Sequence, residues 1–247
     1  MNLDRQYKNP PFVEALCEFT FQSKRWDWTI PGLMYHRISK DFPKKRQQEW
    51  FGMQLSKGSG ESQKLQHGID KMQFLEEKER KIIQLSPNLL AINMLAPYLG
   101  WTTFKKDILR NIRIYYEIAN PEKIKKISLR YINHINFDSE IDDKDYFSIT
   151  PKLPSPIPDV LSGIFLRYHI PYNTYPEMNL QLILGTRPSP KNKVSVAFDL
   201  NMVSNQNYFE LDKLEHWLDE AHIRLKTAFI VSLTEKAHEE IFQEVHK

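Results

Sequence analysis

The 247-residue chain has a net charge of +3, with 41% hydrophobic and 26% charged residues, a globular composition that excludes a disordered protein. Its only cysteine, Cys17, excludes an internal disulfide and a cysteine-based zinc site. The sequence has no run of about 18 apolar residues, and residues 1–8 are polar. We therefore expect no membrane-spanning helix, no signal peptide and a location in the reducing cytoplasm.

The first part of the chain reads as a strand, a helix, three strands and a second helix. These elements are expected over residues 13–22 (strand), 30–42 (helix), 70–75, 81–85 and 89–96 (strands) and 101–118 (helix). Apolar and polar residues alternate from Cys17 onward, which is the period of a half-buried strand. Pro31 suits the first turn of the first helix and Pro43 ends it, whereas the polar residues 54–68 predict a surface loop.

The second part repeats this order more loosely. Its elements are expected over residues 126–137 (strand), 159–163 (short helix), 165–171, 178–184 and 193–203 (strands) and 211–231 (helix). Thr234 is a suitable cap for a final helix that runs to His246. A short sequence similarity between the two parts supports duplication, because Leu129-Arg130-Tyr131 resembles Leu166-Arg167-Tyr168.

Consecutive strands followed by long amphipathic helices predict an α+β fold with two layers. We expect a mainly antiparallel sheet covered by long helices, and an internal duplication of a strand-helix-three strands-helix unit. The expected half-units are residues 1–125, which are basic, and 126–247, which are acidic, packed as one compact body.

The sequence of residues 7–21 resembles the N-terminal signature of a sporadically distributed bacterial family of unknown function, whose members have about 250 residues. The resemblance rests on Asn9-Pro10-Pro11, on Val13-Glu14-Ala15-Leu16-Cys17-Glu18-Phe19 and on later landmarks at 129–133 and 218–222. It spans residues 7 to about 242 and carries no assigned catalytic residues. Its patchy distribution implies mobile genes, such as defence or toxin–antitoxin cassettes.

Four side chains in two predicted strands are candidates for binding an anion: Arg130, His134, Arg167 and His169. Within each strand the two residues are separated by an even number of positions, so both point to one face of the sheet. If the two strands are neighbours, the four groups converge and can hold a phosphate, with a histidine moving a proton. The alternative is an ordinary solvated sheet face.

The amphipathic helix over 101–118 carries a basic face, formed by Lys105, Lys106, Arg110 and Arg113. This spacing predicts a stripe that contacts single-stranded nucleic acid, or a plain solvent-facing surface. The sequence isoelectric point of 8.7 lies below the value of about 9 typical of nucleic-acid-binding domains, which favours the second interpretation.

The C-terminal helices are acidic, and Glu215, Asp219 and Glu220 are candidates for docking a protein partner. Glu215, Asp219 and His222 also follow the i, i+4, i+7 spacing of metal ligands, but this spacing is equally that of a solvated helix face, and we assign no metal. Residues 1–136 contain 23 Lys and Arg against 14 Asp and Glu, whereas residues 137–247 contain 11 against 17. This asymmetry favours docking of a partner or a second copy, unless the two parts offset each other within one chain.

Phosphate-loop, dinucleotide-binding, zinc-protease and Gly-x-Ser-x-Gly hydrolase motifs do not occur in the sequence, so we assign no catalytic residue and no cofactor. We predict a non-enzymatic binding or regulatory protein that acts through protein–protein contacts, with self-association as one form of them. The alternatives are a phosphodiester- or nucleotide-handling enzyme or sensor, and a single-stranded nucleic-acid binder acting through the basic first half.

Overall fold

The computed structural model describes residues 3–22, 26–55, 63–138, 145–150, 154–157, 163–174, 176–189, 193–204 and 208–245. In order along the chain, the elements are β1 (Phe12–Gln22), α1 (Ile30–Ile38), β2 (Lys44–Leu55), β3 (Gln63–Leu75), β4 (Lys81–Ser86), β5 (Leu89–Leu95), α2 (Trp101–Ala119), β6 (Lys123–Asp138), β7 (Phe165–Tyr172), β8 (Met178–Arg187), β9 (Lys193–Ser204) and α3 (Leu214–Val231). The predicted α+β class with a mainly antiparallel sheet is confirmed.

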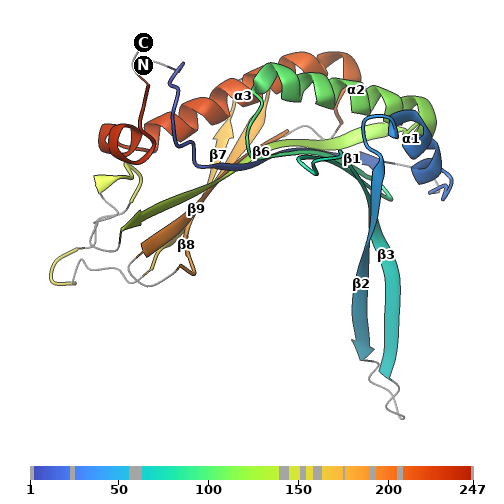
Figure 1. Cartoon of the computed structure of the whole chain (residues 1–247), viewed down its shortest axis with the longest axis horizontal. Coiled ribbons are helices and arrows are strands. Elements are labelled where there is room, and N and C mark those ends of the chain that lie inside the picture. Colours follow the sequence, from blue (N-terminus) through green and yellow to red (C-terminus); the bar gives the residue numbers. More distant parts are fainter. Residues whose placement is uncertain are drawn as a thin grey trace.

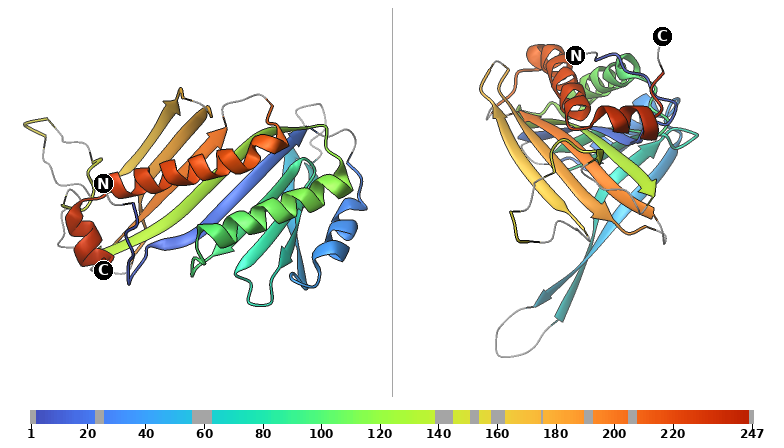
Figure 2. Two further views of the ribbon diagram at one scale, coloured as in Figure 1. Left: turned by 90° about the horizontal axis from the view of Figure 1, so that it is seen from above. Right: turned by 90° about the vertical axis from the view of Figure 1, so that its left-hand side faces the viewer.

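The nine strands of the described residues form one antiparallel sheet in the order β2-β3-β4-β5-β1-β6-β9-β8-β7. The two central strands, β1 and β6, pair with each other. On its other side β1 pairs with β5, the strand before α2, and β6 pairs with β9, the strand before α3. The sheet is arched, and α1, α2 and α3 all lie on its convex side (Figure 1). Seen from above, α2 and α3 lie over the sheet in one layer (Figure 2).

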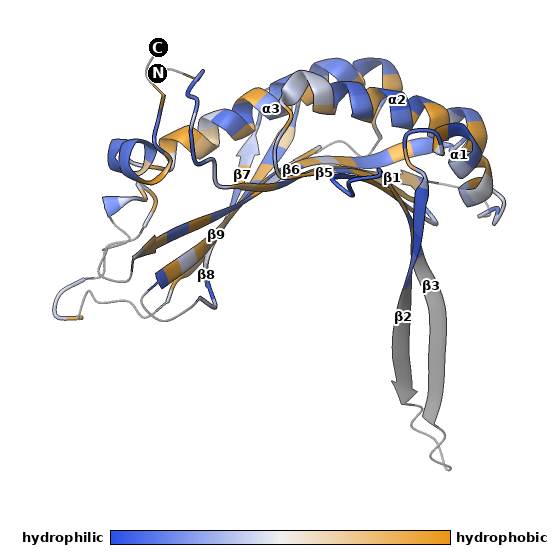
Figure 3. Cartoon of the chain, in the orientation of Figure 1, coloured by the Kyte–Doolittle hydropathy of each residue, from blue (hydrophilic) through white to orange (hydrophobic). Residues whose placement is uncertain are grey.

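The core lies between this helix layer and one face of the sheet. Along β1 every second side chain, including Cys17, Phe19 and Phe21, is fully buried, as the alternation predicts. The amphipathic face of α2 buries Phe104, Ile108, Ile112 and Tyr115, and Tyr115 stacks on Phe21 with ring centroids 4.6 Å apart. Along β8 and β9, hydrophobic and hydrophilic residues alternate (Figure 3), so only one face of these strands adds to the core.

The N-terminal residues are bound to the C-terminal ones. Arg5 forms ion pairs of 2.6 Å with both Glu235 and Glu244, and the Tyr7 hydroxyl lies 2.8 Å from Nδ1 of His238. The backbone N–H of Asn9 donates to the carbonyl of Phe242. These contacts hold the segment before β1 against the end of α3 and the turns that follow it.

Several predicted boundaries were wrong. The first helix ends at Ile38, not at residue 42, and the predicted loop over 54–68 overlaps the ends of β2 and β3, which pair as a hairpin. The final helix does not run to His246, because a short π-helical turn over Ala237–Ile241 ends it, although Thr234 does accept the N–H of Ala237 as a cap. The short helix predicted over 159–163 lies almost wholly outside the described residues.

The predicted duplication and the layer of long helices are not supported. Helix α1 and strand β2 have no counterpart among the described elements of the second half. The longest helix, α2, has 19 residues, or about 28 Å at 1.5 Å per residue, which is shorter than the width of nine strands at about 4.8 Å each. None of the described helices combines the length and the apolar character needed to cross a membrane.

Candidate functional site

The face of the sheet that points away from the helices, which we call the open face, carries polar side chains from several neighbouring strands. On β1 it carries Glu14, Leu16 and Glu18, which alternate with the buried core residues. Cross-strand partners share a face, so the registers place Arg130 of β6, Asp199 of β9 and Ile183 of β8 on it as well. Unlike the convex face, it has no helix among the described elements lying over it (Figure 1).

A chain of hydrogen bonds crosses the first half of the open face. The Gln73 amide donates to Gln84 over 3.2 Å, and the Gln84 amide donates to Asn93 over 2.9 Å. The Asn93 amide in turn donates to the carboxylate of Glu14. Because these residues come from four neighbouring strands, β3, β4, β5 and β1, the chain of bonds ties these four side chains together across the first half of the open face.

The second half of the open face is organised by a bidentate ion pair. Nε of Arg130 donates to Oδ1 of Asp199 over 2.8 Å, and Nη2 donates to Oδ2 of the same carboxylate. The bonded carboxylate raises the pKa of Arg130 further above its ordinary value, against the effect of burial. Beside this pair, the Asn201 amide donates to Gln181 over 3.3 Å. Within the described chain, the side-chain Oδ1 atoms of Asn179 and Asn201 accept no hydrogen bond.

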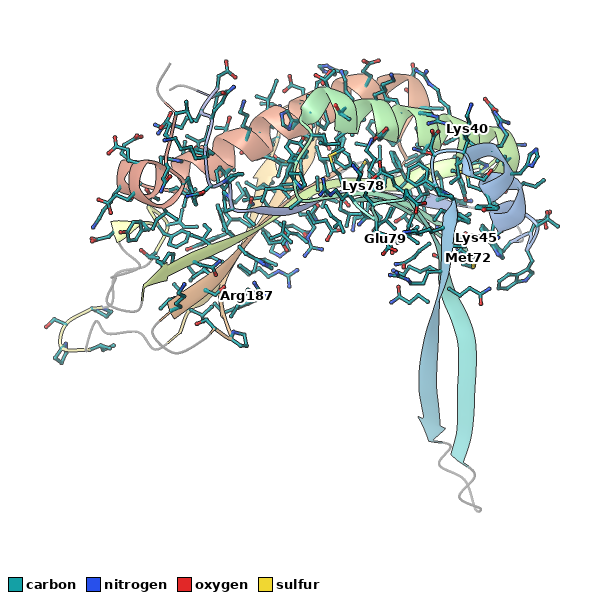
Figure 4. All side chains as sticks on the ribbon, in the orientation of Figure 1. Lys40, Lys45, Met72, Lys78, Glu79 and Arg187 are labelled. Atoms are coloured by element: carbon teal, nitrogen blue, oxygen red, sulfur yellow. The ribbon has the colours of Figure 1, made fainter. Side chains whose placement is uncertain are left out.

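The four predicted anion-binding residues share the open face but do not form one cluster. Strands β9 and β8 lie between β6, which carries Arg130 and His134, and β7, which carries Arg167 and His169. Arg130 is paired with Asp199, as described above. A residue that the sequence did not single out, Arg187 of β8, lies on the same side (Figure 4) and, after burial, is the second cause that lowers the pKa of His134. The open face of the second half therefore carries a spread of basic side chains, and the charge of one of them, Arg130, is balanced by Asp199.

The predicted basic and acidic helix faces meet at one basic residue, Lys105. Nζ of Lys105 on α2 lies 3.2 Å from Glu215 and 3.1 Å from Asp219, both on α3. Arg110 pairs with Asp41, and Glu220 pairs with Arg224. The two remaining members of the predicted nucleic-acid stripe, Lys106 and Arg113, are exposed. The charge asymmetry along the sequence is thus partly offset inside one chain at the α2–α3 contact.

A pocket with a cavity volume of about 150 Å³ opens between the N-terminal segment, α3 and the two strands β6 and β9. Its lining is mostly apolar: Pro10, Pro11, Phe12, Leu200, Leu225 and Phe229, with Tyr7, Tyr131, Asn133, His222 and Lys226 as polar members. The sequence pattern did not identify Tyr131 as a pocket residue. Tyr131 lies on the apolar face of its strand, where the alternation predicts an ordinary core residue. The available signal for His222 is its spacing, four residues after Leu218 and three before Leu225, which places it beside the apolar stripe of α3.

Tyr98, Tyr131 and His222 form a chain of hydrogen bonds next to the pocket. The Tyr131 hydroxyl lies 3.1 Å from the Tyr98 hydroxyl and 2.9 Å from Nδ1 of His222. The His222 ring stacks on Trp101 at 4.3 Å, and the Trp101 N–H donates to Asp219 over 2.9 Å. Burial, reinforced by Lys226 and opposed by Asp219, lowers the pKa of His222 to about 4, and burial raises the pKa of Tyr131. All three groups are therefore neutral at neutral pH.

The neutral state of His222 predicts acid sensitivity. The unfolded histidine, with a pKa of 6.5, takes up a proton before the folded one does, so the free energy of unfolding falls as the pH drops from about 6.5 towards 4. The contribution of this residue to that fall is about 3 kcal/mol. Urea titrations at several pH values between 7.5 and 4 measure this effect. The free energy of unfolding of His222→Gln should fall less with decreasing pH than that of the parent. His36→Gln, at an exposed position of α1, should follow the parent. An unchanged slope in His222→Gln would contradict the assignment.

Among the described residues, no group of three or more His, Cys, Asp or Glu side chains is placed to hold a metal ion. Glu215, Asp219 and His222 have other partners, because the two carboxylates bind Lys105 and the imidazole binds Tyr131.

Comparison with known proteins identifies no relative: no family model matches the chain, and no curated protein matches it.

Proposed function

We propose that this chain is a non-enzymatic binding protein that receives a partner protein on the open face of its sheet. The observation that carries the proposal is the open face itself, a broad arched surface whose polar side chains are held in place by hydrogen bonds from strand to strand. Side chains that are already fixed lose little conformational freedom on association, which favours binding. As the resemblance of residues 7–21 implies, the partner is encoded beside it in a defence or toxin–antitoxin cassette.

The helix layer is a weaker candidate for the same role. Its acidic side chains Glu215 and Asp219 both bind Lys105, so part of their negative charge is already balanced within the chain. The open face instead retains Arg167 and Arg187 beside half-buried apolar residues such as Ile183. Arginine is enriched at protein interfaces, although charged residues in general are depleted from their centres.

A second candidate function uses the same face for an anionic ligand. It is favoured by the placement of Arg167, His169, His134 and Arg187 on one side of the sheet. Binding of a labelled 12-nucleotide single strand that weakens steeply with added salt, by about one power of ten per tenfold salt for each phosphate contact, is the result expected of this candidate. The acidic Glu14 and Glu18 at the centre of the face disfavour it.

The proposal is tested by charge reversal on the open face with a matched change elsewhere. The partner is first isolated from the native host with the full chain as bait and then purified. Arg187→Glu is expected to weaken its binding about tenfold, because an exposed interface charge is reversed. Arg113→Glu reverses another exposed arginine, on α2, and is expected to leave the dissociation constant unchanged.

The opposite pattern, loss with Arg113→Glu and none with Arg187→Glu, would place the interface on the helix layer and refute the assignment. Failure of the purified chain to bind any host protein at micromolar concentration would remove the function as a whole. Ile183→Asp, checked for folding by circular dichroism, is a second test on the same face, one strand in from the β7 edge, and is also expected to weaken binding.

A further inference from the structure

Strand β7 is an edge of the sheet that carries exposed apolar side chains. Among the described strands it pairs only with β8. Phe165 is 72% exposed, Ile170 41% and Tyr168 39%, although all three lie in regular strand. The other edge differs, since β2 begins with Lys44, Lys45 and Arg46, cations of the type that discourages pairing of an edge with another chain.

Alternate residues of β7 direct their backbone N–H and C=O groups away from β8, towards the outer edge of the sheet. The N–H of Thr186 donates to the carbonyl of Ile164 over 2.9 Å, so this pair is of the hydrogen-bonded kind. In an antiparallel ladder such pairs alternate, and the register therefore directs the N–H and C=O groups of Phe165, Arg167 and His169 away from β8. Pro171 follows in the same phase, and its missing N–H falls on the outward side, where β8 requires no donor.

The two faces of β7 differ in chemistry. Arg167 and His169 are opposite Ile183 and Gln181 and lie on the open face, on the side that also carries Arg187. Tyr168 and Ile170 are opposite the buried Leu182 and Leu180 and lie on the helix side. A strand added to this edge would therefore match it best with acidic residues towards the open face and apolar residues towards the helix side.

A second copy of the chain fits this edge poorly. Antiparallel pairing of two β7 strands about a twofold axis keeps both open faces on the same side of the joined sheet. The cationic Arg167 of one copy would then lie on the same face of the joined sheet as Arg167 of the other, across the new strand pair. Like charges directly opposite each other destabilise a strand pair.

We propose that β7 accepts an extended segment of the partner protein as a tenth strand, and that this segment alternates acidic and apolar residues. The inference rests on the proposed function and specifies how the partner is held. Main-chain hydrogen bonds to Phe165, Arg167 and His169 give the affinity, while Arg167 and the Tyr168–Ile170 surface select the sequence.

The test uses the full chain and a labelled ten-residue peptide in which Glu alternates with Val, capped at both ends. We expect saturable binding that is lost at least about tenfold in His169→Pro, because this change removes one outward N–H and leaves the β8 ladder intact. His169→Ala keeps the N–H and is the matched control, with binding close to that of the parent. Arg167→Glu should weaken binding about tenfold, and the amides of Arg167 and His169 should become protected from hydrogen exchange in the complex.

Equal binding by His169→Pro and His169→Ala would overturn the proposal, as would equal binding of a peptide with the same composition in one Glu block and one Val block. A dimer in solution with these amides already protected would show that a second copy occupies the edge. If β7 variants bind the purified native partner normally while Arg187→Glu does not, the inference fails and the proposed function stands. If neither set of variants affects the partner, both fail.

Discussion

Replacing Trp217 with alanine is expected to lower the free energy of unfolding by about 3–4 kcal/mol. Trp217 lies on the inner face of α3, is 1% exposed and packs edge-on against Phe209 with ring centroids 6.1 Å apart. Alanine at this position leaves a cavity between α3 and the sheet that the surrounding strands fill only in part. The indole N–H has no partner in the described chain, so its removal offsets a small part of the loss.

The matched control is Trp28→Ala. Trp28 is 70% exposed at the turn before α1, and its loss is expected to change stability by less than about 0.5 kcal/mol. Urea denaturation followed by far-ultraviolet circular dichroism measures both, without depending on tryptophan fluorescence. Equal effects of the two substitutions would mean that α3 does not pack on the sheet as described.

The second large effect is expected at the ion pair of the open face. Arg130→Ala should cost about 2–3 kcal/mol, because it leaves the Asp199 carboxylate, 11% exposed, without its cation. The same change should raise the sensitivity of the protein to denaturant at neutral pH. Arg130 itself is 37% exposed, which keeps the expected loss below that of a fully buried pair.

A double-mutant cycle separates the pair from its surroundings. Arg130→Met combined with Asp199→Leu removes both charges and should recover most of the stability that either single change loses, since no unpaired charge remains. Additive losses in the cycle would show that the two groups do not interact. A cost below about 0.5 kcal/mol for Arg130→Ala would mark the pair as an ordinary surface contact.

These two predictions concern the framework on which the proposed interface depends. Trp217 holds the helix layer to the convex side, and Arg130–Asp199 holds side chains of two strands on the open face. A variant that loses partner binding through either change would lose stability too. The charge reversals at Arg187 and Arg167 are designed for exposed positions so that binding is measured on a folded protein.

Local sequence patterns were sufficient for most of the secondary structure. The alternation from Cys17 predicted β1, the three- and four-residue spacing around Phe104 and Ile108 predicted α2, and the same reasoning located β4, β5, β8 and β9. Period two also placed Arg130 and His134 on one face correctly. Each of these features is encoded within a few residues, because burial of one side of a strand or helix repeats with a fixed period.

Strand β2 was missed for a physical reason. Its sequence begins with Lys44, Lys45 and Arg46 and shows no clear alternation, so nothing local distinguishes it from a polar loop. It is a strand because β3 supplies hydrogen-bond partners along the whole hairpin. Such pairing is a property of two segments and cannot be found in either alone.

The sequence by itself determined the α+β class, the phase of most strands and the helix faces that enter the core. The tertiary structure alone decided that β9 and β8 separate β6 from β7, and that Lys105 meets Asp219, 114 positions away. It also decided that Tyr131 meets His222, and that β7 is left at an edge. These outcomes depend on the order in which strands join the sheet, which is set by the sum of long-range packing and pairing energies instead of by any local period.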